Sequence, residues 1–362
     1  MKKSIILYFI YLSFGDIFYY QSLLAKDIKY QFKKNIKKVS KEQIPGIYWI
    51  LNNMPESHMD SISLDFLLEN SEVAYKARNN TPWGKGIPDK IFFEYVLPYS
   101  NLNERIDDWR RDFYDRFHPI VKNLPSAYSA SALLNQKIFN ELGVTYSTKR
   151  PKVDQSPYES IKAGMASCTG LSILLINACR SVGIPARFVG TSMWYNNSGN
   201  HSWVEVWDNK WHFTGAAEPT GDSLNIVWFS DLANNAIKSN MKYGIFAATW
   251  AATDKYFPLS WMSDNKEYYA IEVTDRYKID DIQSNLVPIR ICVLDSIGKR
   301  KKVTVGITFG NDFQQGISKD ESFDANDHLI FMVPRNQRFV LETTNQKVEY
   351  TADKERLIKI KL

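Results

Sequence analysis

The stretch Ser167-Cys-Thr-Gly-Leu-Ser-Ile-Leu-Leu-Ile-Asn-Ala-Cys-Arg-Ser181 decides the fold. Its length and almost continuous apolar character predict a buried helix over residues 168–181, with Ser167 as the N-cap. Gly183-Ile-Pro185 ends this helix, because glycine and proline interrupt a helical backbone. Beyond this point the apolar period changes to two, which is typical of strands. We expect these strands at residues 187–191, 201–207 and 210–214.

Helical patterns precede this stretch, and short strands follow it. Apolar residues recur every three or four positions between residues 61 and 120, where Pro119 is expected to end a helix, and again over residues 129–142. Beyond about Tyr268, turn signals separate some seven short alternating runs. We therefore expect an α+β protein with a helical N-terminal region (26–125), a core (126–265) and a C-terminal all-β, immunoglobulin-like sandwich (266–362).

The composition is that of an ordinary folded protein. Of the 362 residues, 44% are hydrophobic and 23% are charged, which excludes a disordered chain, a collagen-like chain and a multi-span membrane protein. The net charge of +5 is spread along the chain, whereas nucleic-acid-binding proteins usually concentrate basic residues on one stripe. We therefore expect no nucleic-acid partner. No motif for a metal, a nucleotide or another cofactor occurs, so we expect none.

The first residues resemble an export signal. Lys2 and Lys3 precede an apolar run over residues 5–14, and Ala25 is a suitable end for a cleaved segment. We expect a signal peptide at residues 1–25 and a secreted or periplasmic protein of the cell envelope. A retained N-terminal anchor is the alternative, although the apolar run is shorter than the ~20 residues that span a membrane.

Three cysteines occur, and we expect all of them to be free thiols. Cys168 and Cys179 belong to one predicted helix, roughly 16 Å apart along its axis at 1.5 Å per residue, which is too far for a disulfide. Cys292 lies in the predicted sandwich. No Cys-x-x-Cys pair is present, which excludes a zinc ribbon.

Cys168 is the candidate nucleophile, because the N–H groups of a helix N-terminus favour the thiolate form. The alternative for a single cysteine at this position is a small buried hydrophobic residue. His201 begins the next strand but one, and counting across the turn of the 201–214 hairpin places Glu218 next to it. Cys168, His201 and Glu218 would then follow one another along the chain as nucleophile, base and orienting acid.

Three blocks within residues 156–220 resemble the transglutaminase-like cysteine superfamily: Cys168-Thr-Gly-Leu-Ser172, Gly183-Ile-Pro-Ala-Arg-Phe-Val-Gly190, and His201-Ser-Trp-Val-Glu-Val-Trp207 with Trp211 after it. The resemblance implies a papain/transglutaminase-like core in which Cys168 is the nucleophile and His201 its base. The usual aspartate position after the return strand holds Gly215, and Glu218-Pro-Thr220 resembles the usual Asp-Pro-Thr with three extra residues before it.

The remaining site residues leave alternatives open. Glu218 is the preferred third member, Asp222 or a non-acidic partner is the alternative, and Glu205 is expected to be structural. By analogy with papain-like enzymes, Gln155 is the second oxyanion donor, or else a solvated loop residue. Trp203 and Trp194 either line a substrate groove or belong to the core.

Taken together, these residues favour an exported, cofactor-free cysteine hydrolase or acyltransferase. Its substrate would be an amide bond in a peptide, a protein or the cell wall, and hydrolysis is favoured over transamidation because water is always available. A non-catalytic surface binding or scaffold protein on the same fold is the alternative function.

Overall fold

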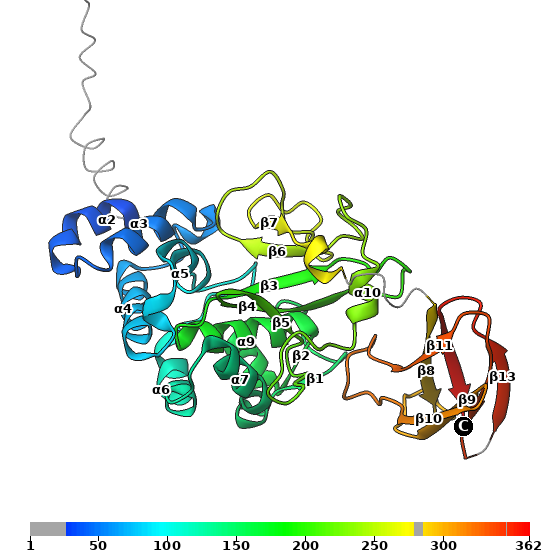
Figure 1. Cartoon of the computed structure of the whole chain (residues 1–362). Helices are drawn as coiled ribbons and strands as arrows, with labels where there is room; N and C mark the ends of the chain where they lie inside the picture. The colour runs from blue at the N-terminus through cyan, green and yellow to red at the C-terminus, as the bar shows by residue number, and fades with distance from the viewer. Residues whose placement is uncertain (1–26, 279–284, 345) are drawn as a thin grey trace, which may run out of the picture.

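The computed structural model describes residues 27–278, 285–344 and 346–362 (Figure 1). The predicted signal peptide at residues 1–25 lies outside these ranges. Within them, no helix combines the length and the apolar character that a membrane crossing requires. The fold is a mixture of helices and mostly antiparallel sheets, an α+β arrangement as the sequence predicts. The helices of the described residues are α2 (Ile28–Asn35), α3 (Ile44–Asn53), α4 (Leu64–Asn80), α5 (Asp89–Tyr95), α6 (Arg110–Val121), α7 (Ala127–Leu142), α8 (Pro157–Ala163), α9 (Cys168–Ser181) and α10 (Ser230–Asn234).

The helix bounds around Pro119 differ from the prediction. Helix α6 contains Pro119 in its last turn and ends only at Val121. It also begins later than the apolar pattern suggests, because the buried Glu104 carboxylate accepts hydrogen bonds from the backbone N–H groups of Asn101 and Leu102 and holds a turn there. Leu102 and Trp109 are therefore buried from the loop that precedes α6.

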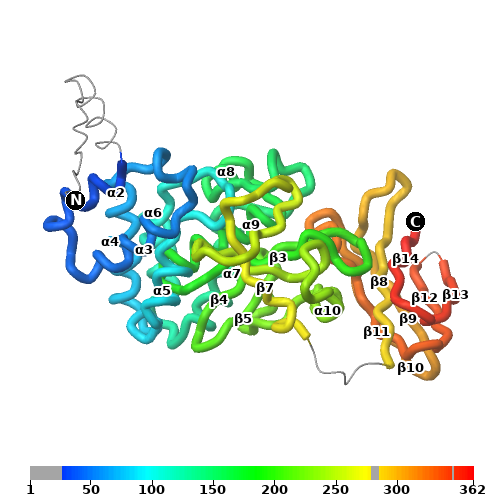
Figure 2. The backbone as a smooth tube through the Cα atoms, turned by 90° about the horizontal axis from the view of Figure 1, so that it is seen from above, coloured from blue at the N-terminus to red at the C-terminus, as the bar shows by residue number. Residues whose placement is uncertain are grey.

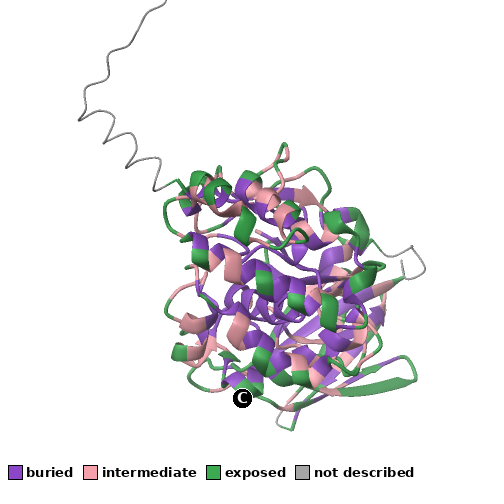
Figure 3. Cartoon of the chain, turned by 90° about the vertical axis from the view of Figure 1, so that its left-hand side faces the viewer, coloured by how far each residue is buried: buried purple, intermediate pink, exposed green. Residues whose placement is uncertain are grey.

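Helix α9 and a five-stranded sheet form the core. The sheet order is β5-β4-β3-β6-β7, and α9 packs against β3 and β4, with α6, α7 and α8 around it (Figure 1). From Thr169 to Ser181 every residue of α9 is buried, which explains why its sequence is apolar on most sides. Figure 3 shows how buried residues gather inside the molecule and exposed ones on its outside. The strands are β3 (Ala186–Thr191), β4 (His201–Asp208), β5 (Lys210–Thr214), β6 (Phe246–Thr249) and β7 (Tyr269–Glu272), and a short parallel pair is formed by β1 (Thr145–Tyr146) and β2 (Met165–Ala166).

The C-terminal strands form two sheets, ordered β10-β9-β12-β13 and β11-β8-β14. Apolar side chains from both sheets, such as Ile291 and Ile307, share one buried cluster, so the two sheets pack face to face. Strand β14 runs parallel to β8. The immunoglobulin-like assignment and the domain boundaries stay predictions. The strands are β8 (Leu286–Leu294), β9 (Thr304–Phe309), β10 (Asp312–Ile317), β11 (Leu329–Pro334), β12 (Arg338–Glu342), β13 (Lys347–Thr351) and β14 (Arg356–Lys361).

The loop between β10 and β11, here called the 318–328 loop, contacts the core. The views in Figures 1 and 2 place it on the core side of the sandwich. The backbone N–H of Ala325 donates to the Tyr146 hydroxyl at 3.1 Å, and the Asn326 side chain donates to the Asn200 carbonyl at 3.0 Å. Within the sandwich, the buried Arg300 guanidinium donates to three carbonyls of this loop, those of Phe323, Asp324 and Asp327. The loop is therefore fixed from both sides.

Candidate active site

Cys168 is the first residue of α9, and its position follows from local sequence. The Ser167 side chain caps the helix by accepting a hydrogen bond from the Gly170 N–H at 3.1 Å. A Cβ atom at Gly170 would lie 3.0 Å from the Ala166 Cβ, so a larger residue would force the first turn of α9 and Ala166 slightly apart. Cys168 is partly exposed, whereas Cys179 and Cys292 are buried, and all three are free, as predicted.

His201 lies beside the Cys168 thiol. The imidazole begins β4 and is 1% exposed, and α9 crosses β4 at this end of the strand. The Cys168 Sγ, one imidazole nitrogen and one Asp324 carboxylate oxygen all lie within 4.8 Å of one another. The predicted meeting of sulfur and imidazole at the helix–sheet junction is therefore present.

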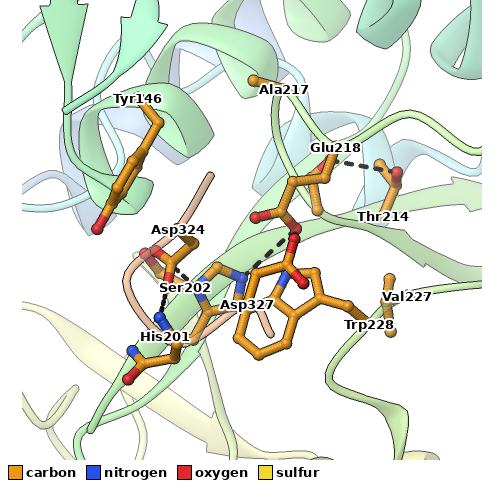
Figure 4. Close-up of polar contacts among 12 residues, drawn as sticks. Tyr146, His201, Ser202, Thr214, Ala217, Glu218, Val227, Trp228, Asp324 and Asp327 are labelled. Atoms are coloured by element: carbon orange, nitrogen blue, oxygen red, sulfur yellow. Dashed lines mark hydrogen bonds and ion pairs between the residues drawn. The ribbon is translucent and has the colours of Figure 1, made fainter. Parts of the chain in front are cut away.

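Two carboxylates approach the imidazole, one at each nitrogen (Figure 4). Glu218 Oε2 lies 3.7 Å from His201 Nε2, and Asp324 Oδ2 lies 3.6 Å from Nδ1. Because Asp324 also lies within 4.8 Å of the thiol, it occupies the same side of the ring as Cys168. Glu218 is on the other edge, where an orienting acid of a cysteine–histidine pair is required.

The other candidate acids lie elsewhere. Asp222 is exposed and accepts a hydrogen bond from Gln136. Glu205 is fully buried and binds Arg187, Arg276 and Tyr277, which fits its predicted structural role.

Gly215 makes room for Glu218. A Cβ atom at Gly215 would lie 1.9 Å from Glu218 Oε2, so the carboxylate uses space that only glycine leaves open. The turn between them is fixed by Asn135, which accepts from the Ala217 N–H and donates to the Gly215 carbonyl. Trp228 Nε1 donates to Glu218 Oε2 at 2.9 Å and holds the carboxylate in place. Gly215 thus occupies the position where the family usually has an aspartate, and the carboxylate of Glu218, three residues later, lies over it.

The carboxylates favour the charged form of the imidazole. Burial on its own lowers the pKa of His201, but Glu218 and Asp324 outweigh it and hold this pKa well above its usual value. In turn, burial raises the pKa of Asp324, and the neighbouring His201 more than compensates and lowers it. Asp327, on the same loop, has a pKa raised to about 7, chiefly by burial. The surroundings of His201 therefore favour an imidazolium between the two carboxylates.

The remaining predicted residues surround this centre. Gln155 is buried, and its side-chain N–H groups are directed at the Met165 and Glu159 carbonyls, so its role as an oxyanion donor stays a prediction. Of the two alternatives for Trp203 and Trp194, a substrate groove or the core, the structure shows the core, because both are fully buried in one apolar cluster. Their rings lie behind His201, with centroids 6.0 and 6.4 Å from the imidazole, and keep water away from it.

Space next to His201 is small, but it adjoins a larger hollow. The cavity that includes His201, Thr169 and Trp261 has a volume of about 20 Å³, enough for about one water molecule. It shares Phe257 and Pro258 with a hollow of about 640 Å³. That hollow is lined mainly by residues 254–265 and is large enough to hold part of a substrate.

Glu218→Gln should lower the pKa of His201, because it removes a negative charge 3.7 Å from Nε2. Histidine resonances followed by NMR against pH measure this directly. Since the imidazolium is then lost at lower pH, the falling limb of the pH–activity profile should move to lower pH, with kcat/KM reduced on the order of 10²-fold.

Gly215→Ala tests the same contact without removing the charge. The new Cβ should displace the flexible Glu218 carboxylate from His201 and move the pKa of His201 in the same direction. Asp222→Asn, which removes an exposed carboxylate nearby, is the matched control and should leave the His201 titration unchanged. A normal titration in Gly215→Ala would contradict the assignment of Glu218.

Comparisons with known proteins agree with this core. Residues 116–215 match the family model of the transglutaminase-like superfamily, a range that includes Cys168 and His201 and ends before Glu218 and Asp324. No curated protein matches the chain.

Solved structures give low similarity scores. A candidate cysteine protease from Cytophaga hutchinsonii matches with 23% identity and a TM-score of 0.26, over 31% of this chain and 37% of that one. Red sea bream transglutaminase matches with 9% identity and a TM-score of 0.34, over 76% of this chain and 66% of that one. A C-terminal fragment of the pilus adhesin SpaC from Lactobacillus rhamnosus GG matches with 8% identity and a TM-score of 0.17, over 49% of this chain and 88% of that one. The chain thus spans about a third of the first protein's length. On the family match, this chain contains a core domain of the transglutaminase-like superfamily at residues 116–215.

Proposed function

We propose that this protein is an exported cysteine-dependent hydrolase or acyltransferase that acts on amide bonds of peptide, protein or cell-wall substrates. One observation carries the proposal: the partly exposed Cys168 lies at a helix N-terminus, within 4.8 Å of a buried imidazole that carboxylates flank at both nitrogens. The apolar run and basic residues at positions 1–25 support export.

The chemistry follows from the charges of the site. The thiolate of Cys168 attacks the substrate carbonyl carbon and forms a tetrahedral oxyanion, for which the Cys168 backbone N–H is a donor. His201 then donates its proton to the leaving amine as the C–N bond breaks, which leaves a thioester and a neutral imidazole. Neutral His201 takes a proton from water, and the resulting hydroxide attacks the thioester to release the acid and the thiolate.

An amine in place of water would give transamidation by the same steps. We favour hydrolysis, because the small cavity beside His201 has room for about one water molecule. The hollow along residues 254–265 carries apolar side chains such as Met241, Tyr256 and Leu259, which suits side chains of a peptide substrate.

Mass spectrometry of peptide and cell-wall libraries tests the proposal. Full-length protein and Cys168→Ala are incubated with the same libraries, and products are compared. A product that requires Cys168 identifies the bond that is cleaved or formed. The absence of any such product from both library types would favour the non-catalytic binding function.

Iodoacetamide should modify Cys168 alone, in one equivalent per chain, at neutral pH. Burial raises the pKa of both Cys179 and Cys292 and shields them from the reagent. His201→Ala should slow the modification on the order of tenfold or more, because an unassisted thiol is only a few per cent thiolate at neutral pH. Peptide mapping locates the label, and a rate equal to that of a small model thiol would count against an activated nucleophile.

A further inference from the structure

The three side chains at the centre of the site offer one sulfur, one nitrogen and one oxygen donor. Their donor atoms lie within 4.8 Å of one another. Donors around one Zn²⁺ ion lie about 2.0–2.3 Å from the metal, and therefore within roughly 4 Å of each other. His201 and Asp324 already meet this spacing at 3.6 Å, and small side-chain rotations bring in the Cys168 sulfur.

His201 supplies an independent sign that this cluster accepts a ligand. The side chain is 1% exposed, yet the carboxylate oxygens that face its two ring nitrogens lie 3.6 and 3.7 Å away, beyond hydrogen-bond distance. Buried polar atoms without a partner are uncommon, and each calls for an explanation. Glu218 completes the pattern, because a histidine that binds a metal through one nitrogen usually faces a carboxylate with the other.

We propose that Cys168, His201 and Asp324 bind a borderline-soft divalent cation, with Zn²⁺ as the best fit, and that this ion reversibly silences the nucleophile. A thiolate and an imidazole exclude Mg²⁺ and Ca²⁺, which prefer oxygen donors only. Three protein ligands leave a fourth position for water. Binding of the ion by the thiolate and the imidazole releases one imidazolium proton to solvent, and the positive charge of the bound ion lowers the nucleophilicity of the sulfur.

The ion would join two distant segments of the chain. Cys168 and His201 belong to the core, whereas Asp324 belongs to the 318–328 loop, which Arg300 fixes to the sandwich. An ion that binds only when these segments meet stabilises that arrangement by mass action. The metal site depends on this geometry alone, and only the silencing depends on the proposed function.

Cobalt is a suitable probe, because Co²⁺ occupies zinc sites and absorbs light where Zn²⁺ does not. Full-length protein, reduced and freed of metal by chelation, is titrated with Co²⁺. We expect a thiolate-to-cobalt charge-transfer band in the near ultraviolet that saturates at one equivalent and disappears on addition of Zn²⁺. Cys168→Ala should abolish the band.

Asp324→Asn tests the contribution of the sandwich. Asparagine keeps the Oδ1 that accepts from the Asn326 N–H but replaces the ligating Oδ2, so the loop should fold normally. Its Co²⁺ affinity should fall at least ~10-fold, since changing even an outer-shell partner costs about 10- to 100-fold. Asp327→Asn, on the same loop but outside the three-residue cluster, is the matched control and should change the affinity far less.

These readouts separate the two proposals. Three results would each overturn the metal site. The first is that the unmodified protein shows no charge-transfer band with Co²⁺, and the second is that Cys168→Ala still shows it. The third is that Asp324→Asn binds Co²⁺ as tightly as the unmodified protein. Iodoacetamide modification of Cys168 should slow at least tenfold with one equivalent of Zn²⁺, and an unchanged rate would overturn the silencing. None of these measurements needs a substrate, so a failure to find one would contradict the proposed function and leave the metal site intact.

Discussion

Replacing Cys168 with alanine should reduce turnover on the order of 10⁴-fold or more. Alanine removes the sulfur that forms the thioester, and no other cysteine can replace it, because Cys179 lies within α9 and Cys292 within β8. The measurement is product formation per enzyme on whichever library member the wild type converts.

Cys292→Ala is the control for this variant, since it removes a thiol from the sandwich without touching the site. It should keep turnover close to that of the wild type. If Cys168→Ala still forms product at the wild-type rate, the chemistry belongs to another part of the chain.

Glu205→Ala should lower the free energy of unfolding by about 3–5 kcal/mol, the cost of leaving a buried charge unpaired. Glu205 and Arg187 are 0% and 3% exposed, and their side chains meet at 2.6 Å on neighbouring strands β4 and β3. Glu205 also accepts from Arg276 at 2.6 Å and from the Tyr277 hydroxyl at 2.8 Å. Alanine would leave the Arg187 guanidinium buried without its carboxylate partner, and it would remove the hydrogen bonds that join the sheet to residues 274–277.

Urea denaturation monitored by circular dichroism measures this loss. Glu342→Ala provides the comparison, because Glu342 forms an exposed pair with Lys347 and such pairs contribute about 0–1 kcal/mol. Equal losses in the two variants would show that the Glu205 network does not stabilise the core.

The central helix and hairpin could be predicted because their signals are local. Ser167 and Gly183 bracket α9, and its predicted bounds of 168–181 are those observed. The hairpin of β4 and β5 follows from alternation and a short turn, and its register of Val204 opposite Thr214 brings Glu218 close to His201. Counting residues along the chain is enough when the partners are joined by one turn.

Asp324 could not be predicted in the same way. More than a hundred residues separate it from His201, and it lies in a loop with no periodic pattern. Its position depends on how the sandwich packs against the core and on the buried Arg300, which are tertiary features. The choice between groove and core for Trp203 stayed open for a related reason. Alternation shows that Trp203 faces one side of β4, but only the packed structure shows that Phe229 and Tyr277 cover that side.

The contact between Asp324, in the 318–328 loop, and His201 restricts how such a protein can evolve. A gene rearrangement that exchanged the C-terminal module for another would withdraw one of the two negative charges that stabilise the imidazolium, even though the cysteine and its base stayed in place. His201, Arg300 and Asp324 should therefore be inherited as a set. Hybrids that join the core of one parent to the sandwich of another should keep activity only when both parents carry all three residues.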